Sequence, residues 1–167
     1  MSFQKAWDLA RWLEGGLSDR ADDPGRLTNE GMTQATWSGL GFPGSVADAT
    51  PAQIEASFFK LWTLVMVGPV HLFDRIPEPA DAVAFQLYIN LPPAEFIKAL
   101  QNAVGMMPSG KLDGDIIDAM KDLRGGELAR NLLVAQREHY ADKAKSVFIE
   151  GLEMRAQRAE IWLLQNS

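Results

Sequence analysis

Residues 3–33 read FQKAWDLARWLEGGLSDRADDPGRLTNEGMT, and this stretch decides which fold the chain adopts. Apolar side chains recur at helical spacing up to Leu13 and fall within an arc of about 120°. Gly15 and Gly16 end the pattern, because glycine is common at the positions that directly follow a helix. The sequence therefore predicts an N-terminal helix over residues 3–14, followed by a polar segment.

The rest of the chain also predicts helices. A capping box at Thr50 and Gln53 starts a helix that we expect to end near Gly68. Apolar periodicity and Pro or Gly breaks then predict further helices over residues 79–90, 92–105, 113–123 and 127–164, the last bent near Tyr140.

One short region is compatible with β-structure. Leu27-Thr28 and Met32-Thr33 are brief β-tolerant pieces that we expect to pair as a hairpin. We expect this to be the chain's only sheet. The predicted fold class is mainly α, one compact unit with a small β-hairpin wing near the N-terminus.

Composition excludes several classes of site and partner. The chain has 167 residues, no cysteine and two histidines, so we expect no thiolate chemistry, no histidine-rich zinc site and no cofactor. Its net charge of −6 argues against nucleic acid as a partner. No apolar run is long enough for membrane insertion, and we recognise no N-terminal signal peptide.

Glu14 is the first candidate for chemistry, because helical spacing puts it in the otherwise apolar arc of the first helix. Burial raises the pKa of a carboxyl group, and a carboxylic acid that is protonated near neutral pH can act as a general acid. The alternative is structural: Glu14 reaches solvent or pairs with Arg11, three residues earlier.

Polar side chains that could share a site with Glu14 follow it closely. They are Asp22, Asp23, Thr28, Asn29 and Thr33. Hydrolysis of a glycosidic bond uses one carboxylic acid to protonate the leaving oxygen and, in inverting enzymes, a carboxylate that activates water. The alternative for the two aspartates is a turn that leads into Pro24-Gly25. Trp37 is the one tryptophan outside the expected helices, and it is our candidate for stacking on a sugar ring.

Several motifs in this sequence resemble the glycoside hydrolase 108 family, which contains phage and prophage muramidases (endolysins) and "secretion activator" proteins. The resemblance covers most of the chain. The motifs are Glu14-Gly15-Gly16, Asp22-Asp23-Pro24-Gly25, Thr28-Asn29-Glu30-Gly31-Met32-Thr33, Ala99-Leu100-Gln101-Asn102-Ala103-Val104-Gly105, Leu112-Asp113-Gly114 and Phe148 with Gly151-Leu152-Glu153-Met154-Arg155.

The resemblance implies a lysozyme-like fold in which Glu14 is the general acid. Asp23 and Thr28 then position or activate the water, with Asp22 as the competitor for the place of Asp23. Asn29, Thr33 and Trp37, together with Asp22, are the expected substrate-binding residues. The resemblance further implies a catalytic region over residues 1–80 and a helical peptidoglycan-binding-like region over 81–167, packed as one unit.

The sequence departs from the family pattern at a few positions. Arg26 replaces a glycine, Glu30 stands where an aromatic residue is common, Gln86 and Leu91 replace an aspartate and a glycine, and Leu152 replaces a tryptophan. These departures bear on substrate binding and turnover more than on the fold.

Arg155 is a cation within the apolar stripe of the last helix. A buried cation requires a partner. We consider Glu14 as that partner, with Asp74 or Asp118 as the structural alternatives.

The expected activity is that of an N-acetylmuramidase, which cleaves the β-1,4 bond between N-acetylmuramic acid and N-acetylglucosamine. The alternatives are a lytic transglycosylase and a catalytically weak peptidoglycan-binding or phage-structural protein. The expected partner is the glycan strand of peptidoglycan. Synthesis in the cytoplasm without a signal peptide would require a holin, a phage tail or a secretion apparatus for access to the cell wall.

Overall fold

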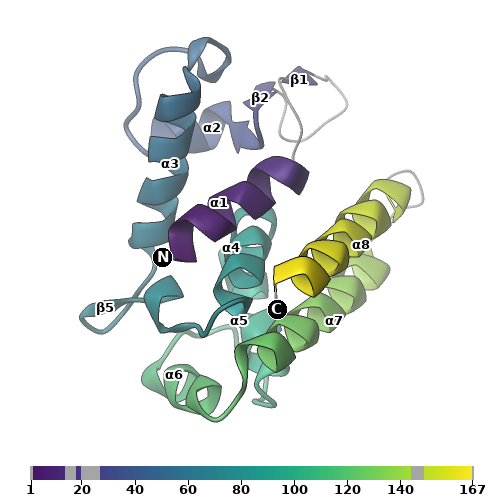
Figure 1. Ribbon diagram of the computed structural model, residues 1–167. Coiled ribbons are helices and arrows are strands. Elements are labelled where there is room, and N and C mark those ends of the chain that lie inside the picture. The colour runs from purple at the N-terminus through teal and green to yellow at the C-terminus, as the bar shows by residue number, and fades with distance from the viewer. Residues whose placement is uncertain (1, 14–17, 20–26, 144–148, 167) are drawn as a thin grey trace.

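The computed structural model describes residues 2–13, 18–19, 27–143 and 149–166. In these ranges the chain is mainly helical, with two small antiparallel sheets (Figure 1). The elements in chain order are α1 (Ser2–Leu13), β1 (Ser18–Asp19), β2 (Leu27–Asn29), β3 (Met32–Thr33), α2 (Gln34–Gly39), the 3-10 helix η1 (Val46–Asp48), α3 (Pro51–Leu64), β4 (Met66–Val67), β5 (Val70–His71), the 3-10 helix η2 (Phe73–Arg75), α4 (Ala80–Asn90), α5 (Pro93–Ala103), α6 (Gly114–Lys121), α7 (Gly125–Lys143) and α8 (Ile149–Asn166).

Helix α4 forms the centre of the molecule. Its residues from Ala80 to Leu87 are all buried. A helix that is buried on every side requires neighbouring elements to cover all of its faces. Both α1 and α7 pack against α4, and α5 packs against α7. The helices expected over residues 79–90, 92–105 and 113–123 are confirmed as α4, α5 and α6.

Aromatic side chains join α1 to this centre. The rings of Trp7 and Phe58 lie 4.7 Å apart, and those of Phe3 and Trp62 lie 5.9 Å apart. The Trp62 ring in turn lies 5.2 Å from Phe85 on α4. Each such aromatic pair adds about 0.5–1.5 kcal/mol to the stabilisation from burial. The apolar face of α1 is therefore packed against α3 and α4.

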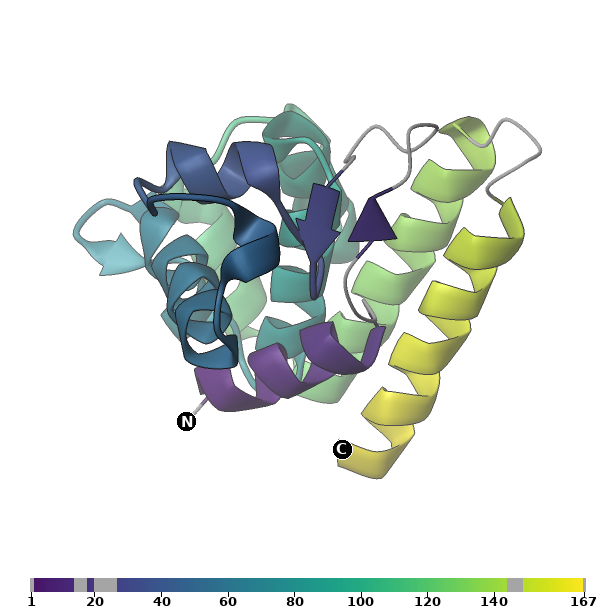
Figure 2. The same cartoon turned by 90° about the horizontal axis from the view of Figure 1, so that it is seen from above.

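The expected hairpin is confirmed and has a third strand. β2 pairs with β3, so that Thr28 lies opposite Thr33, and β1 pairs with the other edge of β2. We refer to these three strands as the wing. Figures 1 and 2 both show it between the α2–α3 side of the molecule and the pair α7–α8.

The prediction that the wing is the only sheet was wrong, since β4 and β5 form a second hairpin. Gly68 has a φ of +59° in its turn, a conformation that glycine adopts without steric cost. Helix α3 begins with the predicted Thr50–Gln53 capping box but ends at Leu64, because the next residues enter this hairpin.

The predicted bent helix over residues 127–164 is instead two helices. α7 and α8 run antiparallel and pack side by side (Figure 2). The Arg137 guanidinium on α7 donates to the Glu160 carboxylate on α8 at 2.8 Å. The predicted bend at Tyr140 was therefore wrong, because the two amphipathic halves bury their apolar faces against each other as well as against the core.

Hydrophobic side chains from α1 to α8 form one connected core. This core crosses residue 80, and the division into regions 1–80 and 81–167 stays a prediction. None of the helices in the described ranges is long and apolar enough to cross a membrane.

Candidate functional site at the end of the first helix

The apolar arc predicted for α1 is buried. Ala6 and Ala10 are fully buried, and Trp7 and Leu13 are at most 7% exposed. The described helix ends at Leu13, and Glu14 is the next residue in the sequence. Glu14, Asp22, Asp23 and Arg26 lie outside the described residues, so their places in the site stay predictions.

The wing pairs residues on either side of the predicted acidic segment. Ser18, four residues after Glu14 in the sequence, lies opposite Thr28 in the antiparallel ladder. Directly opposed residues in such a ladder have Cα atoms about 4.5–5.5 Å apart. The strand register therefore brings Thr28 next to Ser18 on β1.

An ion pair fastens the wing to the last turn of α1. The Arg11 Nε lies 3.5 Å from Glu30 Oε2, and Glu30 occupies the turn between β2 and β3. The Arg11 guanidinium also stacks over the Trp7 ring, 5.6 Å from its centroid. Glu30 has a φ of +48°, which is uncommon outside glycine and costs backbone energy. Glu30 Oε2 is buried and has no hydrogen-bond partner among the described residues, so its contact with Arg11 is a long-range electrostatic one.

This ion pair is the feature that sequence reasoning missed. The sequence suggests Arg11 only as a partner for Glu14, and it shows Glu30 only as a departure from the family pattern. Nineteen residues separate the two in the sequence, so helical spacing gives no signal for their contact. The hairpin between Leu27 and Thr33 was the usable clue, because its turn carries Glu30 back toward α1.

Two of the predicted substrate-binding residues hold the wing in place. Asn29 Nδ2 donates to the Val46 carbonyl at 3.0 Å, which joins β2 to η1. Thr33 is the N-cap of α2, and its hydroxyl oxygen accepts from the Thr36 backbone N–H at 3.1 Å. By contrast, the half-buried Thr28 hydroxyl has no hydrogen-bond partner among the described residues, so it is free to bind a water molecule.

Trp37 lies in the core, which corrects the expectation that its ring stacks on a sugar. It is 1% exposed, and its ring stacks on Phe42 at 4.5 Å. Its indole Nε1 donates to the Pro43 carbonyl at 3.2 Å. Because α2 is a regular helix that was not predicted, Trp37 lies on a buried helix face rather than on a loop.

Arg155 contacts an amide instead of either structural alternative. Its Nη1 donates to Asn90 Oδ1 on α4 at 2.9 Å. Asp74 accepts from the Trp62 indole and Asp118 pairs with Lys121, so the pairs expected from the sequence do not form. The pairing of Arg155 with Glu14 stays a prediction, because Glu14 lies outside the described residues.

Comparison with known proteins connects this geometry to a family. The family model described as glycosyl hydrolase 108 matches residues 9–91, which include the end of α1, the wing and α4. The chain belongs to this family. Among the solved structures, SagA of Brucella abortus has 26% sequence identity and a TM-score of 0.79 with this glycosyl hydrolase 108 protein. The match covers 99% of this chain and 95% of SagA. A comparison with curated proteins gives no match.

The fold class predicted from the sequence is therefore confirmed as mainly α and lysozyme-like, with an N-terminal β-wing. Membership in the glycosyl hydrolase 108 family supports the broad class of peptidoglycan hydrolases. The wing, α3 and α4 all lie within the matched residues, whereas α5 to α8 lie beyond them.

Three departures from the family pattern are accommodated inside the fold of this glycosyl hydrolase 108 protein. Glu30 forms the ion pair with Arg11. Gln86 is fully buried, and its Oε1 accepts from Gln136 Nε2 on α7 at 3.2 Å. Leu91 is 7% exposed and belongs to the core. Leu91 is accommodated by packing, while Gln86 Nε2 is buried without a hydrogen-bond partner among the described residues.

Proposed function

We propose that this glycosyl hydrolase 108 protein is an N-acetylmuramidase that hydrolyses the β-1,4 bond between N-acetylmuramic acid and N-acetylglucosamine. Its substrate is the glycan strand of peptidoglycan. Glu14 acts as the general acid that protonates the leaving oxygen. Asp23 and Thr28 hold and activate the attacking water, and Asp22 is the alternative carboxylate.

The two carboxyl groups, of Glu14 and of Asp23 or Asp22, have different roles because their surroundings differ. An acid on an apolar helix face has a raised pKa and keeps its proton, while a solvated loop carboxylate stays ionised. The five apolar residues that precede Glu14 on its helical arc are buried or half-buried, which supports the first condition. The free Thr28 hydroxyl supports a place for water near the second group.

The observation that carries this proposal is the link between α1 and the wing. The contact of Arg11 with Glu30 and the pairing of Ser18 with Thr28 connect the wing to the last turn of α1 and to β1. A general acid needs a partner group at a fixed distance, and such a distance requires two elements that do not move relative to each other. A wing that contacts the last turn of a buried helix supports that arrangement.

A lytic transglycosylase needs the acid but no attacking water, so its products end in anhydro sugars. The alternative that is not an active enzyme is a catalytically weak wall-binding or phage-structural protein. It is favoured by Gln86 and Leu91, which stand where the family pattern has an aspartate and a glycine. Access to the wall would be provided by a holin, a phage tail or a secretion apparatus.

Clearing of a suspension of purified cell walls tests the proposal. Wild type should clear the suspension, and Glu14→Gln should lose that activity while it keeps the wild-type circular dichroism spectrum. Asp8→Asn is the matched control, because it removes an exposed carboxylate from the same helix. Equal clearing by wild type and Glu14→Gln would reject Glu14 as the acid, and no clearing by wild type that binds walls would favour the non-catalytic alternative.

A further inference from the structure

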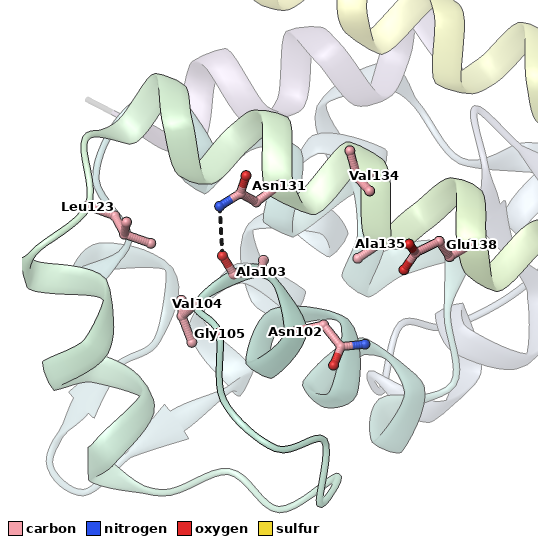
Figure 3. A pocket seen from close by; sticks show the side chains of 9 residues that line it. All are labelled: Asn102, Ala103, Val104, Gly105, Leu123, Asn131, Val134, Ala135 and Glu138. Carbon is pink, nitrogen blue, oxygen red and sulfur yellow. Dashed lines mark hydrogen bonds between the residues drawn. The ribbon is translucent and has the colours of Figure 1, made fainter.

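A pocket of about 510 Å³ lies between the C-terminal end of α5 and the middle of α7 (Figure 3). Its volume is within the range of about 300–1,000 Å³ that is typical of small-molecule sites. Every lining residue lies between Asn102 and Glu138. None of the lining residues belongs to residues 9–91 or to the wing.

Contacts between α5 and α7 form the pocket before any ligand is present. Asn131 Nδ2 on α7 donates to the Ala103 carbonyl at 2.9 Å, in the last turn of α5 (Figure 3). The backbone N–H of Gly105 closes the end of α5 by donating to the Asn102 carbonyl at 3.0 Å. A ligand would therefore bind walls that are already fixed, which lowers the entropy cost of binding.

The pocket combines apolar walls with one charged group. Ala103, Val104, Val134 and Ala135 provide aliphatic surface, and Val134 is 53% exposed. Among the described residues that line the pocket, Glu138 is the charged one. Figure 3 shows its side chain reaching from α7 toward the side of the pocket where α5 carries Asn102.

Glu138 is exposed, and no described residue places a cation beside its carboxylate. Its neighbours on α7 pair elsewhere: Arg137 with Glu160 on α8, and His139 with Glu95 on α5 at 3.5 Å. The residues three and four positions away are valine, alanine, alanine and aspartate, so α7 offers no cation at helical spacing. Within the described ranges Glu138 has neither an ion-pair nor a hydrogen-bond partner.

We propose that this pocket binds an aliphatic ammonium group, of the kind carried by a lysine-type diamino acid in a peptide. The ammonium pairs with the Glu138 carboxylate. The methylene stem packs against Val104 and Val134, in the way that lysine stems cover apolar surface. The Asn102 carboxamide then hydrogen bonds to an amide of the peptide.

Titration of the full chain with Nα-acetyl-lysine methylamide, followed by NMR amide shifts and calorimetry, tests this proposal. Shifts should concentrate at residues 102–105 and 131–138. The norleucine analogue, which has an aliphatic side chain but lacks the ammonium, should bind at least about fivefold more weakly, in keeping with a partly exposed ion pair. Pentylamine tests whether the ligand is a free amine or a peptide. Affinity equal to that of the lysine derivative supports a free amine, and weaker affinity supports a peptide.

Two variants keep the test specific. Glu138→Gln should lose about fivefold in affinity for the lysine derivative and none for the norleucine analogue. Val134→Lys places an ammonium four residues before Glu138 on the same helix face and should compete with the ligand. Glu127→Gln is the matched control, because it removes an exposed carboxylate from the same helix outside the pocket. Equal binding by wild type and Glu138→Gln, or shifts spread over the whole chain, would overturn the proposal.

The outcome is independent of the proposed hydrolysis. Glu14→Gln should bind the lysine derivative like wild type, and Glu138→Gln should cleave a glycan that carries no peptide at the wild-type rate. A chain that binds the ligand but cleaves nothing would reject the proposed function and leave the pocket assignment standing.

Discussion

The substitution Trp37→Phe tests whether Trp37 stabilises the core or binds a sugar. Trp37 is 1% exposed, so removal of part of its ring leaves a cavity that costs about 1–2 kcal/mol. The substitution also removes the hydrogen bond to the Pro43 carbonyl. Pro43 is exposed and its carbonyl can turn to water, so this loss costs about 0.5–1 kcal/mol.

The free energy of unfolding should therefore fall by about 2 kcal/mol, which corresponds to a loss of about 4–8 °C in Tm for a chain of this length. Urea and thermal unfolding followed by circular dichroism measure both quantities. The KM for cell-wall glycan should stay at the wild-type value below the unfolding transition. Trp12→Phe, at a tryptophan that is 45% exposed, is the matched control and should change neither property. Wild-type stability together with a raised KM in Trp37→Phe would refute the assignment of Trp37 to the core.

Three further predictions concern contacts that hold the site and its surroundings. Glu30→Gln should lower the free energy of unfolding by less than about 1 kcal/mol, because the pair with Arg11 is partly exposed, yet it should reduce wall clearing severalfold; unchanged clearing would separate the pair from the site. Gln101→Ala removes three hydrogen bonds to the loop after α5 and should cost about 2 kcal/mol in chemical denaturation; a cost near zero would show that water replaces them. Lys5 donates to Glu78 at 2.6 Å, which lowers the pKa of Glu78 and raises the pKa of Lys5. The difference in stability between wild type and Lys5→Gln should therefore persist near neutral pH. It should vanish as pH falls through the folded pKa of Glu78, below 4.5, and as pH rises through the folded pKa of Lys5, above 10.5; a difference that does not change with pH would contradict this pairing.

Long periodic segments were predictable from the sequence. The buried face of α1, with Trp7 and Leu13, follows from helical spacing alone. The capping box at Thr50 marks the start of α3, because a capping side chain and its partner are separated by a fixed number of residues.

Short or tertiary features were not predictable in the same way. The two-residue strands of the second hairpin are too short to show alternation, and the glycine in its turn was read as the end of a helix. The six residues of α2 are mostly polar or small, so Trp37 appeared to lie on a loop. Contacts such as Arg11 with Glu30 and Arg155 with Asn90 join distant segments, and residue spacing carries no information about them.

The most direct test of the account is mass spectrometry of the fragments that the protein releases from purified peptidoglycan, with wild type and Glu14→Gln run side by side. We predict that wild type releases fragments with N-acetylmuramic acid at the reducing end and that Glu14→Gln, folded like wild type, releases none. The same fragments from both proteins would contradict the role of Glu14. Fragments with anhydro-muramic ends would show that the protein is a lytic transglycosylase and not a hydrolase.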